Sequence, residues 1–445
     1  MPASLEVEEN PRTLPTLPEG WRYEELGNLV EDRGICYGIV QPGIAIADGV
    51  PIVRVNNVRN RTINTSDMLK VEPSIESKFT RSRLRGGEVL LTLVGTLGEV
   101  AIVPENFQGW NVARAVGVIP VLKDPGNRWV AICLRSVHIQ YCIRTWATST
   151  VQATFNLRDV AKLPIPIPPK EEREAITHIL DRLDDKIELN RQMNATLEAM
   201  AQAIYQSWFV DFDPVKRNAE GGTQRPEDSL FPDSFKDSAG GEIPRGWTVK
   251  RVGDVVDCVG GGTPSTKEPK FWEDGIHHWT TPKDFSSLQS PILINTSRKL
   301  TNAGIAKISS GLLPAGTLLL SSRAPVGYLA ISAIPVAINQ GFIAMKCNDR
   351  ASNYFMLNWC QSNMGEIKSR ATGTTFPEIS KNSFRPISVV LPPKKLVAHF
   401  TVRVAPLYAQ IIANLHQSCN LATLRDTLLP KLLCGELLSS KNRLI

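Results

Sequence analysis

The 445-residue chain lacks the features of secreted and membrane-spanning proteins. Its eight cysteines include no CxxC pair and no spacing shared between the two halves, as is typical of proteins from a reducing compartment. No stretch approaches eighteen consecutive apolar residues, and the first nine residues are acidic, so we expect neither a membrane span nor a signal peptide. These absences predict a cytoplasmic protein.

Motifs of catalysis are missing too. The sequence holds no HExxH, no GxSxG, no Walker sequence and no cysteine–histidine spacing of a zinc site. Its one histidine pair, His277-His278, is a poor metal site, because adjacent residues on a strand point to opposite faces. Neither Pro-Pro pair has the preceding Asn or Asp and the following aromatic residue of an adenine methyltransferase. We therefore expect no catalytic residue and no metal site in this chain.

The strongest positive signal is an internal duplication with a period of about 225 residues. The recurring segments are Leu17–Trp21 with Ile243–Trp247, Gly87–Ile102 with Gly316–Ile331, and Pro168-Pro169-Lys170 with Pro392-Pro393-Lys394, at offsets of 226, 229 and 224. A period this long indicates a duplicated domain with its following helix rather than a solenoid.

A heptad pattern follows each Pro-Pro-Lys, with a 4-3-4-3 spacing. The first seam is Ile176, Leu180, Leu183, Ile187, Asn190, Asn194, Leu197, Ala201, Ile204 and Trp208, and the second is Phe400, Val404, Leu407, Ile411, Asn414, Ser418, Leu421, Arg425, Leu428 and Leu432. If the helices pair antiparallel, Asn190 and Asn414 come face to face, and a buried Asn pair fixes the register. The alternative is that these asparagines face solvent or a partner. The acidic residues Asp184-Asp185 and Glu188 are expected to face solvent.

Each duplicated domain mixes short β-branched runs with one helical stretch. The expected strands are Pro51–Val58, Val89–Val94, Val112–Val121, Leu318–Leu320 and Val336–Met345, and the expected helices are Trp129–Thr148 and Tyr354–Arg370. The fold class is therefore α+β: two pseudo-symmetric α/β domains joined by two long helices that form an antiparallel coiled coil. The predicted boundaries are 17–168 and 243–392 for the domains, 169–210 and 393–438 for the helices, and 211–242 for the linker.

Positive charge gathers on the two domains. Of the net charge of +6, residues 17–168 hold 17 basic against 14 acidic residues, and residues 243–392 hold 16 against 9. This pattern is expected of domains that contact phosphate, although a solvated surface loop would look similar. The candidate phosphate contacts in the first domain are Arg54, Arg59, Arg61, Lys78, Arg81, Arg83 and Arg85.

Six segments of the chain, quoted in order, resemble one family across nearly the whole sequence. They are Phe155–Pro169 (FNLRDVAKLPIPIPP), Ile179–Asn190 (ILDRLDDKIELN), Tyr205–Asp213 (YQSWFVDFD), Phe231–Phe235 (FPDSF), Gly246-Trp247 and Ala337–Phe342 (AINQGF). The chain resembles the specificity (S) subunit of bacterial type I restriction–modification enzymes. It departs from the pattern at Trp110–Gly117, which has no counterpart of the Gln340-Gly341 pair.

The resemblance implies two target-recognition domains, each reading one half of a bipartite, asymmetric sequence in double-stranded DNA. It implies that the coil docks two methyltransferase (M) subunits, with restriction (R) subunits added for cleavage. S-adenosylmethionine, ATP and Mg would then belong to the partner subunits, and no cofactor to this chain. A polar turn precedes the last strand of each domain, and its short side chains suit base edges, although a capped turn has the same composition. The candidate base contacts are Thr150, Gln152 and Thr154 in the first domain and Lys283, Arg323, Thr374 and Thr375 in the second.

A two-headed DNA-binding adaptor without a methyltransferase partner is the main alternative, and an enzyme with an unrecognised site is a weaker one. Trp208, Phe209 and Phe212 favour the specificity subunit over the adaptor. Clustered where the first helix ends, they predict an exposed partner-binding surface, which a lone adaptor has no reason to carry.

Overall fold

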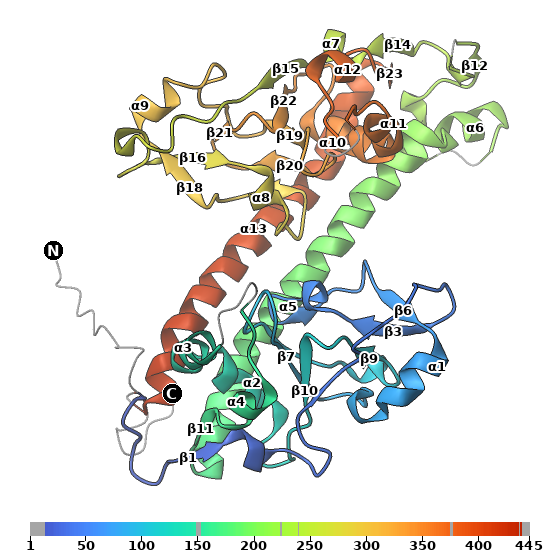
Figure 1. The fold of residues 1–445 in the computed structure, drawn as a ribbon. Helices are drawn as coiled ribbons and strands as arrows, with labels where there is room; N and C mark the ends of the chain where they lie inside the picture. The colour runs from blue at the N-terminus through green and yellow to red at the C-terminus, as the bar shows by residue number, and fades with distance from the viewer. Residues whose placement is uncertain are drawn as a thin grey trace. The chain divides into compact units, whose positions relative to one another are not determined.

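The structure, a computed structural model, describes residues 14–147, 153–222, 225–238, 240–373, 377–435 and 437. The chain divides into two compact units: unit 1 consists of Met1–Asp185 with Leu421–Ile445, and unit 2 of Lys186–Asn420. Each unit combines mixed β-sheets, short helices and part of the two long helices (Figure 1). This is the α+β composition that the sequence predicts.

Unit 1 is built around a four-stranded sheet of order β2-β10-β7-β8, beside a three-stranded sheet of order β6-β3-β9 and the pairs β1-β11 and β4-β5. Its strands are β1 Arg22–Glu25, β2 Cys36–Tyr37, β3 Val50–Val53, β4 Val58–Arg59, β5 Thr62–Ile63, β6 Leu69–Val71, β7 Val89–Thr92, β8 Val100–Ile102, β9 Asn111–Val112, β10 Val116–Ile119 and β11 Pro164–Ile167. Its short α-helices are α1 Pro73–Glu76, α2 Asn127–Arg135, α3 Val137–Trp146 and α4 Leu157–Ala161.

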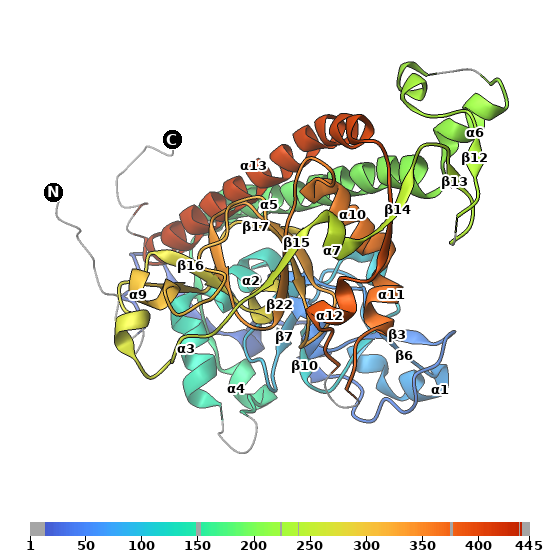
Figure 2. The same cartoon turned by 90° about the horizontal axis from the view of Figure 1, so that it is seen from above.

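Unit 2 has a five-stranded sheet of order β15-β22-β19-β20-β17, a three-stranded sheet of order β18-β16-β21 and the pairs β12-β13 and β14-β23. Figure 2 shows the strands β12 and β13 of this unit beside its helix α6. Its strands are β12 Phe235–Lys236, β13 Ile243–Pro244, β14 Thr248–Arg251, β15 Asp257–Gly260, β16 His277–Thr280, β17 Ile292–Leu293, β18 Arg298–Leu300, β19 Leu318–Ser321, β20 Leu329–Ser332, β21 Val336–Ile338, β22 Phe342–Lys346 and β23 Ser388–Leu391. Its short α-helices are α6 Asp213–Ala219, α7 Val252–Val255, α8 Pro282–Phe285, α9 Asn302–Ile305, α10 Asn353–Ser362, α11 Met364–Ser369 and α12 Lys381–Phe384.

The topology of unit 2 repeats that of unit 1. The order β15-β22-β19-β20 matches β2-β10-β7-β8, and β18-β16-β21 matches β6-β3-β9. In both small sheets the inner strand runs parallel to the last one, since β3 pairs parallel with β9 and β16 with β21. The duplicated sequence segments therefore form two units with the same order and direction of strands.

Alternation along the central strands divides each core into two layers. In β7, Val89 and Leu91 pack in one cluster with Trp129 of α2, whereas Leu90 packs in a second cluster with Val112 of β9. All are buried on a strand whose successive side chains point to opposite faces. In this way one sheet holds the helices on one face and the small sheet on the other.

Five elements that the sequence predicts as continuous are interrupted. The strand expected at Pro51–Val58 is divided by a 3-10 turn at Val55–Asn57. The helix expected from Trp129 is broken at Ser136, whose extended backbone lets its hydroxyl accept a hydrogen bond from Ile139 N and cap α3. The helix expected from Tyr354 is likewise broken at Asn363. The strands expected at Val112–Val121 and Val336–Met345 each divide in two, because a three-residue turn interrupts them.

The two long helices are α5, Lys170–Tyr205, and α13, Lys394–Leu433. Each begins directly after a Pro-Pro pair, where proline ends the strand and no N–H is needed. None of the twenty predicted seam residues is exposed, so the heptad pattern correctly identifies the buried face.

Within unit 2, the two helices run antiparallel. Tyr205 lies beside Phe400, and Asn190 Nδ2 donates hydrogen bonds to the Asn414 carbonyl at 3.4 Å and to Gln417 Oε1 at 2.9 Å. The side chain of Asn414 does not pair with that of Asn190 as expected. Its Nδ2 donates instead to Asn194 Oδ1 at 2.8 Å, because the seam places Asn194 one turn further along. All three asparagines are buried.

Within unit 1, the remaining parts of the helices also pack against each other. Ile176 and Leu180 of α5 share a buried cluster with Leu429, Leu432 and Leu433 of α13. Because low numbers on one helix meet high numbers on the other, the direction here is antiparallel too.

Among the described residues, α13 is the one helix long and apolar enough to cross a membrane by length and composition. A buried core helix passes the same test. Phe400, Val404, Tyr408 and Ile411 of α13 are fully buried within unit 2, which accounts for this apolar character.

The asparagine contact in unit 2 yields a stability prediction. Asn414→Leu leaves Asn194 Oδ1 buried without its donor, so we expect the free energy of unfolding to fall by about 1–3 kcal/mol. The double variant Asn194→Leu/Asn414→Leu removes both polar groups, and we expect it to be less destabilised than the sum of the single variants. Urea unfolding of the full chain tests this coupling. A double variant that loses the full sum would contradict it.

Candidate DNA-binding interface

One residue of the predicted phosphate-binding cluster, Arg61, has a structural role instead. Its Nη1 donates to both carboxylate oxygens of Asp184 on α5, at 2.9 and 2.7 Å, and its Nη2 lies 3.3 Å from Asp426 on α13. Arg425 Nη1 donates to the same Asp184 at 2.6 Å. The prediction that Arg61 contacts phosphate is therefore wrong for this structure, because the guanidinium is held by two carboxylates. The expectation that Asp184 faces solvent is wrong for the same reason.

Burial shapes the ionisation of this ion-pair cluster. Desolvation lowers the pKa of Arg61, and the adjacent Asp184 carboxylate opposes that effect. Arg135, which lies 3.9 Å from Asp184, is more deeply buried, and desolvation lowers its pKa to about 10. Three arginines thus share one half-buried aspartate, an arrangement that stabilises unit 1.

Three further arginines of the cluster are partly committed to other protein groups. Arg54 Nη2 donates to Asp67 at 2.9 Å, and Arg81 Nε donates to the carbonyl of Arg33 at 2.5 Å. Arg83 forms two hydrogen bonds with the buried Glu76 carboxylate, at 2.8 and 2.5 Å, and the bond from Arg83 holds the pKa of Glu76 below its usual value. These side chains would have to give up a protein partner, or share it, to bind phosphate.

Arg59, Lys78 and Arg85 are exposed, as Arg81 is, and within the described part of the chain they form no ion pair. Unlike Arg81, they also donate no side-chain hydrogen bond to a protein group there. They are the members of the cluster whose full positive charge faces solvent. An unpaired surface cation is what phosphate contact requires.

In both units the main chain makes a close crossing over the small sheet. After β2, Gly38 passes so near the carbonyl oxygen of Val112 that a Cβ atom would collide with it. After β15, Gly261 passes Ile338 in the same way. Only glycine fits this approach.

Beyond this crossing lie the two turns that interrupt the expected strands. Ala113–Ala115 connects β9 to β10, and Asn339–Gly341 connects β21 to β22. Leu93 N donates to the Ala115 carbonyl at 2.8 Å, and Ser322 N donates to the Gly341 carbonyl at 2.8 Å. The turns are therefore equivalent, and Arg114 is the counterpart of Gln340.

Thr154 and Glu378 lie at corresponding edges of the two units. Thr154 forms an isolated antiparallel bridge with Val94, directly after β7, and Glu378 forms the corresponding bridge with Arg323, after β19. Of the predicted base contacts, Thr154 is thus held beside the end of the central sheet. Thr150, Gln152, Thr374 and Thr375 lie outside the described residues.

The two remaining predicted residues of unit 2 lie near the Gln340 turn. Lys283 is exposed on α8, whose Pro282 packs against Gly341. Arg323 follows Ser322, which bonds to Gly341, and its guanidinium lies 3.5 Å from Glu378. The structure therefore gathers Lys283, Arg323 and Gln340 at one edge.

Sequence reasoning missed Arg114 and Gln340. Both are exposed at the tips of equivalent turns. The available signal was the offset of 226 residues between Leu17–Trp21 and Ile243–Trp247, which places Ala-Arg-Ala opposite Asn-Gln-Gly. No letter is shared between these triplets, so the match is visible only in the backbone.

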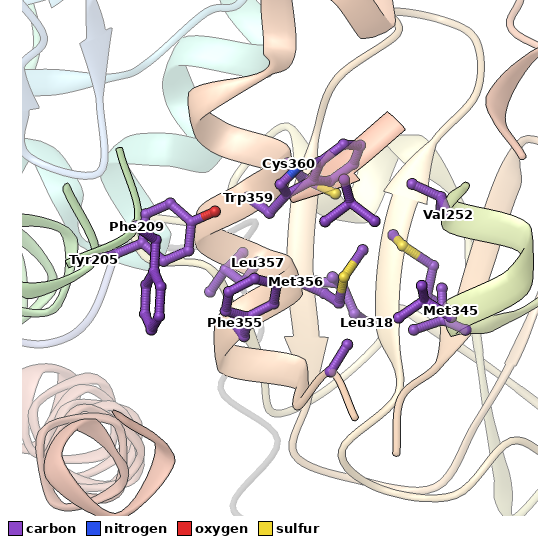
Figure 3. Close-up of a cluster of buried hydrophobic side chains, with 14 of the residues drawn as sticks. Tyr205, Phe209, Val252, Leu318, Met345, Phe355, Met356, Leu357, Trp359 and Cys360 are labelled. Atoms are coloured by element: carbon purple, nitrogen blue, oxygen red, sulfur yellow. The ribbon is translucent and has the colours of Figure 1, made fainter. Parts of the chain in front are cut away.

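The prediction of an exposed aromatic surface is wrong. Trp208 and Phe209 are each 6% exposed, and Phe212 is half-buried. Figure 3 shows Phe209 and Tyr205 beside Phe355 of α10, and their ring centroids lie 5.1 and 5.5 Å from that of Phe355. The end of α5 therefore completes the hydrophobic core of unit 2, because these rings find apolar partners there.

The described residues contain no group of three or more His, Cys, Asp or Glu side chains that could hold a metal ion. His277 and His278 of β16 engage different partners, Asn302 and Thr296 respectively.

Comparison with known proteins assigns a family to these two units. The sequence matches the family described as Type I restriction modification DNA specificity domain over residues 42–199 and 244–396. It is 29% identical over 331 residues to the type I restriction enzyme HindI specificity subunit of Haemophilus influenzae, covering 64% of this chain and 71% of that subunit. It is 35% identical over 160 residues to the MjaIX specificity subunit of Methanocaldococcus jannaschii, covering 36% of this chain and 37% of that subunit.

A solved structure agrees on the fold. The crystal structure of the type I restriction–modification system S subunit from M. genitalium aligns with a TM-score of 0.52 at 14% identity, covering 94% of this chain and 99% of that one. At this identity the likeness concerns the fold alone. Since the family match covers more than half of the chain, the chain belongs to the specificity subunits of type I restriction–modification systems, which recognise DNA and are not themselves enzymes.

Proposed function

We propose that each unit reads one half of a bipartite, asymmetric DNA target. One observation carries the proposal: the two units share their topology and the hydrogen bonds that anchor their edge turns, yet differ in the exposed side chains there. Two units with the same backbone and different exposed side chains would bind DNA in the same way but prefer different base sequences. Two identical readers would instead recognise identical half-sites.

The long helices would act as the spacer between the two recognised halves. Antiparallel contacts between α5 and α13 occur within unit 1 and again within unit 2. An antiparallel coiled coil over the whole length of both helices is the simplest arrangement consistent with both sets of contacts. The buried asparagines support a single register, because a slip would leave amides among apolar side chains.

We further propose that α5 docks a methyltransferase subunit through an exposed apolar stripe. Leu189, Met193 and Met200 are 48%, 36% and 49% exposed, and their spacing of four and seven residues places them on one face of the helix. Solvent-facing apolar residues in register along a helix suit burial by another protein. This stripe takes the place of the buried aromatic residues as the candidate partner surface.

The rest of the assembly follows from the family. Two M subunits would carry S-adenosylmethionine and methylate adenine, and R subunits would cleave DNA with ATP and Mg, all in the bacterial cytoplasm. The DNA-binding adaptor without a methyltransferase partner stays the alternative, and the stripe on α5 argues against it.

The decisive test is methylation-sensitive single-molecule sequencing of DNA from cells that express this chain with its cognate methyltransferase. We expect a split, asymmetric adenine-methylated motif that is absent when the methyltransferase is expressed alone. An assembled complex that adds no methylation would overturn the proposal in favour of the adaptor.

Two arginines of unit 1, two residues apart in sequence, should respond oppositely to replacement by alanine. Arg59→Ala should leave unfolding unchanged and lower the slope of log affinity against log salt by about 1 for the assembled complex, because one phosphate contact is lost. Arg61→Ala should lower the free energy of unfolding by about 1–3 kcal/mol, because Asp184 loses a partner.

Salt titrations of DNA binding and urea unfolding of both variants separate these roles. An unchanged salt slope for Arg59→Ala would remove Arg59 from the interface. Unaltered stability for Arg61→Ala would show that the ion pair is dispensable.

The apolar stripe predicts a defect in assembly. Met193→Asp/Met200→Asp should prevent co-purification with the methyltransferase, because a carboxylate would be buried in the contact. Ala195→Asp/Gln202→Asp adds the same two charges to exposed positions on another face of α5 and should leave assembly intact. Equal co-purification of both variants would place the docking surface elsewhere.

A further inference from the structure

The turn after β9 holds its backbone rigidly while leaving one long side chain free. Ala113 N donates to the Val53 carbonyl at 2.9 Å, and Arg114 N donates to the Ile39 carbonyl at 2.9 Å. Leu93 N donates to the Ala115 carbonyl, so each of the three turn residues is anchored. The side chain of Arg114 is exposed and forms no ion pair within the described residues.

The counterpart turn in unit 2 has two of these three anchors. Asn339 N donates to the Thr280 carbonyl at 3.1 Å, and Ser322 N to the Gly341 carbonyl. Gln340 is exposed here, and its Oε1 accepts a hydrogen bond from Thr263 Oγ1 at 2.6 Å. Because the backbone is held alike with Arg in one unit and Gln in the other, the scaffold does not dictate the side chain.

The residue beside each turn differs as well. Thr263 follows the glycine crossing of unit 2, and the equivalent position after Gly38 is Val40, which is 49% exposed and offers no polar side-chain group. Gln340 therefore has one oxygen already engaged, whereas Arg114 keeps its whole guanidinium available to a ligand.

Arg and Gln differ in charge but have side chains of similar hydrogen-bonding geometry. Both end in a planar group with two hydrogen-bonding atoms side by side, which matches the paired groups on a purine edge. Arg pairs with guanine O6 and N7, and Gln with adenine N6 and N7. A position built only to neutralise phosphate would gain nothing from Gln. Thr154, held at this edge by its bridge with Val94, adds a short side chain suited to bases.

We propose that Arg114 is a specificity-determining residue of unit 1, donating two hydrogen bonds to a guanine in the major groove of the half-site that this unit reads. The inference rests on the proposed DNA-reading function. It assigns one base preference to one side chain.

The test compares the methylated motifs produced by the full complex carrying wild-type chain, Arg114→Ala, Arg114→Gln or Arg114→Lys. Arg114→Ala should relax one guanine position of one half-site, lowering its discrimination roughly 5- to 150-fold, with the other half-site and the gap unchanged. Arg114→Gln, which places in unit 1 the side chain that unit 2 carries at this turn, should shift that position towards adenine. Arg114→Lys keeps the charge without the paired donors and should relax the position as well.

Arg22, exposed on β1, provides the control, because Arg22→Ala removes one surface arginine of the same unit and should leave the motif unchanged. An unchanged motif in Arg114→Ala with lower occupancy, restored by Arg114→Lys, would identify a phosphate contact and overturn the inference. If a variant methylates too little to define a motif, binding of its complex to duplexes with single base changes gives the same comparison. Absence of a chain-dependent motif in the wild type would instead refute the proposed function itself.

Discussion

The close crossing of the main chain over the small sheet is the constraint on which the rest of each unit depends. At Gly38 and at Gly261 the chain passes a carbonyl oxygen with no room for a side chain. That approach lets the next residue bond to the parallel strand, with Ile39 N to Val112 O at 2.7 Å and Gly262 N to Ile338 O at 3.0 Å. The strand ends there, the turn follows, and the backbone that carries the exposed side chain at its tip is fixed in position. Rigid presentation of one variable side chain is what specific recognition requires.

Positive charge in unit 1 serves two purposes that composition cannot separate. Arg61 and Arg83 are held by carboxylates of the protein, whereas Arg59, Lys78 and Arg85 face solvent. Only a few of these cations are therefore free to meet phosphate, and the others contribute to stability. Arg59 and Arg61 are only two positions apart, yet Arg59 faces solvent and Arg61 is held by Asp184, because among the described residues only Arg61 of the two lies near an acidic one.

The most successful sequence predictions were those based on periodic patterns. The duplication, the α+β composition and the buried seam of both helices follow from patterns repeated over many residues, and such patterns survive local irregularity. The prediction failed where long-range contact decides the outcome. Nothing in the local sequence of Arg61 indicates Asp184, which lies 123 residues away. Trp208 and Phe209 look like surface residues at a helix end until the core of unit 2 is in place around them. Sequence comparison does not detect Arg114, because its turn has the same backbone arrangement as Asn339–Gly341 but no identical residue.

The last turns of α13 belong to unit 1, although they are encoded at the other end of the gene. Leu429, Leu432 and Leu433 pack in the core of unit 1, and Arg425 bonds to Asp184 there. A recombination event in the linker that imports a new first half must therefore accept a resident C-terminal segment inside its hydrophobic core. An incoming first half is expected to fold as unit 1 does here only if it packs against these leucines and supplies the carboxylate that Arg425 binds.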